Sequence, residues 1–60
     1  MANEKELRAE HRNRLYQLLK IQKLNPHQKI NGLSDMIENT LAVIDPEDAI
    51  HVKKILTDEN

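Results

Sequence analysis

Two dipeptides, Asn25-Pro26 and Asp45-Pro46, divide this chain of 60 residues into three segments. A residue that precedes proline is pushed out of the α-helical region, so a helix tends to end before each dipeptide. Proline also suits the first position of a helix, where its missing N–H is not needed, and Asn and Asp are favoured N-caps. The two dipeptides therefore predict three helices, the second beginning after Asn25 and the third after Asp45.

We expect a single small all-α domain with frayed ends at 1–3 and 58–60 and with helices at about 4–24, 26–44 and 46–57. Asn3 is the expected N-cap of the first helix, with Glu6 in capping-box spacing. Gly32 weakens the second helix, because glycine is unfavourable in a helix interior. We predict one helix with a weak point there. The alternative is a short turn at 26–31 followed by a helix from residue 34, with Ser34 as its cap.

Leucine and isoleucine supply the apolar surface of these helices, since the chain has one Tyr and neither Phe nor Trp. Branched aliphatic side chains suit helices that meet along a seam. A chain of this length is marginal as a monomer, and without cysteine it cannot add a disulfide. We therefore predict a homodimer, with a seam drawn from nine candidates: Leu15, Leu18, Leu19, Ile30, Leu33, Ile37, Leu41, Ile44 and Ile50.

The acidic cluster around Pro46 has two interpretations. Asp45 as N-cap, proline next and two acids after it make a complete helix start, with Glu47 and Asp48 at the positive end of the helix dipole. Glu47 and His51 are also four residues apart, so both could reach one metal ion. Two ligands on one helix do not complete a site, unless a dimer axis supplies a second pair. We favour the capping interpretation and predict no metal and no other cofactor.

Charge is unevenly distributed, although the net charge is only −1. Residues 1–30 carry seven Lys or Arg and three Glu, whereas residues 31–60 carry seven Asp or Glu and two Lys. This distribution suits helices that pack against one another, and it gives the first helix a cationic face that could meet an acidic partner. The candidate partner-binding residues on that face are Arg8, His11, Arg12, Arg14 and Tyr16.

The alternative for the same arginines is a solvated face, in which Glu4 pairs with Arg8 and Glu10 with Arg14 along the helix. Nucleic-acid binding is a further possibility for a cationic face. Three helices would be enough for a helix-turn-helix, but each placement of its turn puts polar residues on apolar anchor positions. A recognition helix that opened with Glu47 would also repel phosphate.

Catalysis has little support in the sequence, because Gly32 is the only glycine and no nucleophile, base and pocket can be assembled. We therefore predict that the chain is not an enzyme. No apolar run exceeds four residues, and the charged N-terminus does not look like a secretory signal. We expect a soluble cytoplasmic protein with no membrane partner.

In length and helical composition the chain resembles the small Rop-type plasmid regulators, whose two-helix chains dimerise into four-helix bundles. It shares no motif with them, so no residue role is carried over. Spare apolar positions, such as Ile50 outside the apolar stripe of the third helix, favour a protein partner instead. Our prediction is a small non-enzymatic regulator of phage or plasmid type that binds another protein, for example a transcription factor or repressor. The alternative is direct binding of nucleic acid, as a Rop-like RNA binder or a degenerate helix-turn-helix DNA binder.

Overall fold

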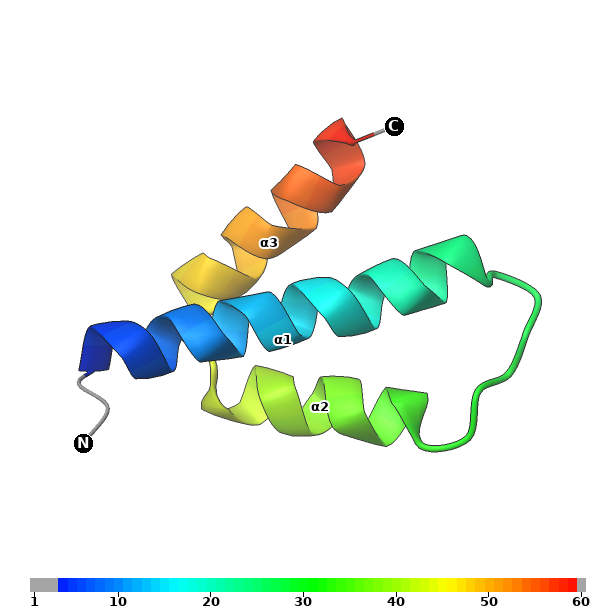
Figure 1. The fold of residues 1–60 in the computed structure, drawn as a ribbon, viewed down its shortest axis with the longest axis horizontal. Helices are drawn as coiled ribbons and strands as arrows, with labels where there is room; N and C mark the ends of the chain where they lie inside the picture. Colours follow the sequence, from blue (N-terminus) through cyan, green and yellow to red (C-terminus); the bar gives the residue numbers. More distant parts are fainter. Residues whose placement is uncertain (1–3, 60) are drawn as a thin grey trace.

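α1 is the helix on which the rest of the chain packs. The computed structural model describes residues 4–59 and contains α1 (Glu4–Leu24), α2 (Leu33–Val43) and α3 (Pro46–Asp58) within them. Both α2 and α3 pack against α1 and hardly contact each other. Figure 1 shows α2 returning antiparallel to α1, and α3 diverging from α2 after the short turn that joins them. The predicted all-helical class with three helices is confirmed for the described residues.

Asn25 ends α1 and does not begin the next helix. Its backbone N–H donates to the Ile21 carbonyl at 3.1 Å, and its side-chain Nδ2 donates to the same oxygen at 2.8 Å. These bonds satisfy a carbonyl that the end of the helix would otherwise leave without a partner. The role predicted for Asn25 as the N-cap of a second helix is therefore corrected.

The second helix begins at Leu33, which corrects the expected helix over 26–44. Gly32 adopts a left-handed conformation with φ of 80°, a region that side-chain-bearing residues adopt at a cost and that no α-helix interior contains. The chain therefore breaks at Gly32, close to the alternative of a turn followed by a helix from residue 34. Gly32 itself occupies the N-cap position, without a side-chain cap, and its carbonyl accepts from the Met36 N–H at 3.0 Å.

The predicted start of α3 is confirmed. Asp45 has an extended backbone, its Oδ1 accepts from the Glu47 N–H at 2.9 Å, and Pro46 occupies the first turn. The other end differs from the expected fraying, because the helix continues to Asp58 and the Glu59 N–H donates to the Ile55 carbonyl at 3.1 Å. The expected N-cap at Asn3 and the fraying of 1–3 and 60 lie outside the described residues.

The core forms where α2 and α3 pack on the middle of α1. Leu15 is completely buried, and the other buried apolar residues are Leu18, Leu33, Ile37, Ile44, Ala49, Val52 and Leu56. Thr40 is also buried, and its Oγ1 donates to the Met36 carbonyl at 2.8 Å, so this polar group keeps a partner. Within residues 4–59, no helix has the length and apolar character needed to cross a membrane.

The core buries some of the nine candidates for the dimer seam and leaves others exposed. Five of them are buried against the chain's own helices: Leu15, Leu18, Leu33, Ile37 and Ile44. Leu19 is partly buried beside them, whereas Ile30, Leu41 and Ile50 are exposed. The homodimer stays a prediction, and in this fold only the exposed members could contact a second copy without rearrangement.

Replacing Gly32 tests whether the chain breaks there. We expect Gly32→Ala to lower the free energy of unfolding by about 1 kcal/mol, because alanine is strained in the left-handed region. A Cβ at this position would meet no atom within 4 Å, so the cost comes from the backbone alone. Gly32→Asn should cost less, since Asn tolerates that conformation. Urea unfolding followed by circular dichroism measures both. Stabilisation by alanine would contradict the break, since that is the result expected inside a continuous helix.

Candidate functional site

The five candidate residues on α1 lie on two different sides of the helix. Arg8, Arg12 and Tyr16 face α3, where they contact acidic side chains. His11 and Arg14 lie on the side facing α2 and line a small cleft there. The predicted cationic face therefore consists of two separate surfaces, one facing α3 and one facing α2.

Arg8 binds Asp48 through a two-pronged contact. Its Nε donates to Asp48 Oδ2 at 3.2 Å, and its Nη2 donates to Oδ1 at 3.3 Å and to Oδ2 at 3.2 Å. The Asp48 side chain is only 10% exposed, whereas that of Arg8 is 55% exposed. Charge-assisted contacts of this geometry are among the stronger hydrogen bonds in proteins, although water screens the exposed guanidinium.

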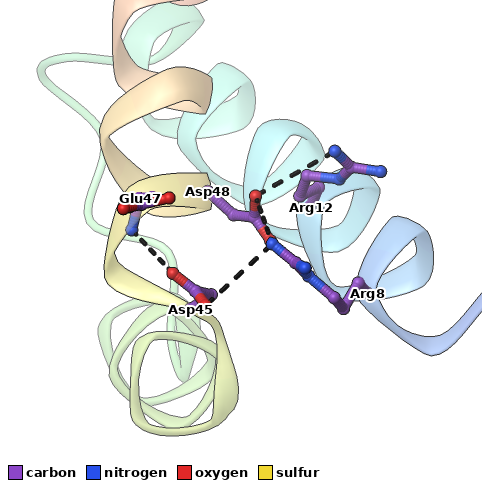
Figure 2. Close-up of polar contacts among 5 residues, drawn as sticks. All are labelled: Arg8, Arg12, Asp45, Glu47 and Asp48. Carbon is purple, nitrogen blue, oxygen red and sulfur yellow. Dashed lines mark hydrogen bonds and ion pairs between the residues drawn. The ribbon is translucent and has the colours of Figure 1, made fainter. Parts of the chain in front are cut away.

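Two weaker ion pairs surround this contact, as Figure 2 shows. Arg12 Nη1 lies 4.0 Å from Asp48 Oδ1, and Arg8 Nη2 lies 4.0 Å from Asp45 Oδ2. The local sequence explains the arrangement. The Asp45 cap fixes the start of α3, which places Asp48 in its first turn on the side facing α1, and Arg8 and Arg12 are one turn apart on α1. The two arginines thus neutralise the acidic start of α3.

The C-terminal end of α3 is held by a second group from α1. The Tyr16 hydroxyl donates to Glu59 Oε1, and Lys20 Nζ donates to Glu59 Oε2 at 3.2 Å and to the Tyr16 hydroxyl oxygen at 3.1 Å. Lys23 Nζ donates to the Leu56 carbonyl, one of the carbonyls left open at the end of the helix. Cations of α1 therefore contact both ends of α3.

These contacts shift two pKa values. The hydrogen bond from Tyr16, helped by Lys20, lowers the pKa of Glu59 below its ordinary value near 4.5. The hydrogen bonds of Lys20 with Tyr16 and then Glu59 raise the pKa of Lys20 above its ordinary value near 10.5. Both directions favour the charged forms that make the contact.

An open groove lies between α1 and α3, and three of its polar side chains, Arg12, Tyr16 and Glu59, already have partners. Its volume is about 420 Å³, and it is lined by Arg12, Asn13, Tyr16, His51, Val52, Ile55 and Glu59. Arg12 is paired with Asp48, and Tyr16 and Glu59 are bonded to each other. A ligand in this groove would have to compete with contacts that hold α3 in place.

The cleft between α1 and α2 is smaller and different in character. Its volume is about 190 Å³, and its lining residues are His11, Arg14, Met36, Asn39, Thr40 and Val43. We call it the His11–Arg14 cleft. Met36 and Val43 are 40% and 61% exposed, so apolar surface flanks His11 and Arg14. Arg14 has no ion pair with any residue among 4–59.

Sequence reasoning missed the contacts that Asp48 makes, because 40 residues separate it from Arg8. It assigned Asp48 only to the helix start. The uneven charge of the two halves of the chain was the available signal, since it favoured helices that pack against one another. Within one copy, no group of three or more His, Asp or Glu among the described residues is placed to hold an ion, so a metal site at Glu47 and His51 would need the second pair that a dimer axis supplies.

Comparison of the chain with models of protein families, with curated proteins and with solved structures gave no match. What the chain does must therefore be inferred from its own residues.

The contact of Tyr16 with Glu59 can be tested by titration. Because the pKa of Glu59 is lowered on folding, its stabilising effect is present above about pH 4.5 and is lost as the pH falls through the folded-state pKa. We expect Tyr16→Phe to raise the pKa of Glu59 towards its ordinary value, since it removes the largest cause of the shift. Lys20→Gln should raise it less. NMR titration of the Glu59 side chain measures this pKa, and an unchanged value in Tyr16→Phe would contradict the contact.

Proposed function

We propose that this chain is a small regulatory protein, without catalytic activity of its own, that acts by binding another protein. In the form predicted from the sequence, it is a cytoplasmic protein of phage or plasmid type whose target is a transcription factor or repressor. Binding of that target by the chain would change the target's activity.

The observation that carries this proposal is the exposed apolar surface on the α2 side of α1, beside Arg14, which has no ion pair among residues 4–59. Scattered exposed apolar residues are ordinary on small proteins. Met36 and Val43 are not scattered, because they line one cleft together with His11 and Arg14. Exposed apolar side chains that share one cleft with polar and charged groups are typical of protein-binding sites.

Direct nucleic-acid binding is the second candidate, and the ion pairs of α1 weaken its support. Arg8 and Arg12 belong to the cationic face that could contact phosphate, and both are paired with Asp48. A phosphate backbone would also approach Asp45 and Glu47 at the same end of α3. The helix-turn-helix form of this candidate gains no support from α2 and α3, which hardly contact each other.

The homodimer remains part of the proposal. Its support is the small core of a 60-residue chain together with the exposure of Ile30, Leu41 and Ile50. Ile50 is on α3 and Leu41 on α2, so a second copy would cover parts of both helices. Sedimentation equilibrium decides this question. A monomer at all concentrations would remove the dimer and leave the proposal of protein binding intact.

Capture from a lysate of the encoding organism separates the two candidates. The folded chain is immobilised, and the lysate is applied with and without nuclease, at low and at physiological salt. We expect one protein to be retained under all four conditions, because contacts built on Met36 and Val43 depend little on salt. Retention that disappears with nuclease would instead support nucleic-acid binding, and a steep fall with salt in the untreated arm alone would support it further.

The control for this capture is an immobilised Leu15→Asp variant. Leu15 is completely buried, so an aspartate there should unfold the chain. A protein retained equally by this variant recognises unfolded chain and would not count as the target. Finding only such proteins, in every arm, would contradict the proposed function.

A further inference from the structure

The His11–Arg14 cleft has one charged group, Arg14, that makes no ion pair within residues 4–59. The groove between α1 and α3 is larger, but Arg12, Tyr16 and Glu59 in it are already partnered. Ile50 is exposed on α3 but does not line a cleft with unpaired charge. Arg14 in contrast has no ion pair within the part of the chain that the structure describes.

The surface around the cleft is long enough for a helix. Leu7 and Ile21 lie seven residues before and after Arg14, so they share its side of α1, and both are exposed. The distance between them along the helix is about 21 Å at 1.5 Å per residue. On α2, Met36 and Val43 are also seven residues apart and stand on one side. The surface thus has apolar side chains towards its ends and cationic or polar groups at its centre.

We propose that this surface docks an acidic amphipathic helix of the partner protein. The inference rests on the proposed function and specifies the chemistry of the partner. Leucine-like side chains near the ends of the docked helix would pack on Leu7, Met36 and Val43. Carboxylates near its middle would pair with Arg14, and His11 beside it would donate a hydrogen bond to one of them. Helix-in-groove recognition has this form, with apolar anchors on one face and charges that set the register.

Charge complementarity distinguishes this occupant from the others. A second copy of the chain, related by a two-fold axis through the cleft, would bring Arg14 close to the Arg14 of the other copy. Like charges placed opposite each other in this way disfavour the contact. A nucleic acid would meet only one permanent cation in the cleft, and it would cover Met36 and Val43 without gaining apolar contacts.

The test uses a synthetic helical peptide of about 15 residues, the length that spans this surface. The acidic peptide carries leucines towards both ends of one face and two glutamates between them, and the basic peptide has lysines in place of the glutamates. Binding to the full chain is measured by fluorescence anisotropy. We expect the acidic peptide to bind and the basic peptide to bind at least tenfold more weakly. Amide shifts in an NMR titration should map to the residues of the cleft.

Arg14→Glu is the decisive variant, and Lys53→Glu is its matched control. Both change the net charge equally, but Lys53 is exposed on α3 and does not line the cleft. Arg14→Glu should weaken binding of the acidic peptide at least tenfold and should strengthen binding of the basic peptide. Lys53→Glu should change neither by more than about twofold. Circular dichroism confirms that both variants remain helical.

Three results would overturn this inference. The first is no binding of the acidic peptide up to about 1 mM, a concentration that already corresponds to weak affinity. The second is that Arg14→Glu and Lys53→Glu change the affinity for the acidic peptide by the same factor. The third is binding of a short DNA duplex that displaces the peptide from the unaltered chain, together with direct binding of the duplex that is weakened by Arg14→Glu and not by Lys53→Glu. If the peptide fails while lysate capture still retains a protein, this inference is wrong and the proposed function stands.

Discussion

The contact between Arg8 and Asp48 joins the start of α3 to α1, next to the buried apolar residues that hold the rest of α3 there. A chain of 60 residues has a small core. The free energy gained by burying Val52 and Leu56 is therefore only slightly larger than the cost of ordering a third helix. Asp48 is nearly buried at the start of α3, where an unpaired carboxylate would be costly. Arg8 removes that cost, and the contacts of Lys20 and Lys23 at the other end of α3 complete the attachment.

Features determined by neighbouring residues could be predicted from the sequence, and features determined by distant residues could not. Asp45 and Pro46 specify the start of α3 by local backbone chemistry alone, and that start was predicted correctly. The start of α2 was not, because the apolar spacing through Ile30 suits a helix whatever conformation Gly32 adopts. The Arg8–Asp48 contact joins two helices, and only the overall charge of each half of the chain hinted at it.

The two sides of α1 therefore have different roles. Arg8 and Arg12 resemble a nucleic-acid-binding face in the sequence, but in the fold they neutralise the acidic start of α3. Arg14 belongs to the same cationic segment and remains without an ion pair among the described residues, next to the exposed Val43. This position of Arg14 beside exposed apolar surface favours a protein partner over a phosphate backbone.

A double-mutant cycle of Arg8→Met and Asp48→Asn tests the central claim most directly. Methionine keeps the apolar stem of the arginine side chain, and asparagine keeps the shape of the aspartate side chain. The cycle therefore isolates the charged contact. We predict a coupling free energy of about 0.5–1 kcal/mol in urea unfolding, reduced by the exposure of Arg8. The matched cycle of Arg14→Met with Asp48→Asn should be additive within about 0.3 kcal/mol. Additivity in both cycles would contradict the claim that Arg8 holds α3 in place.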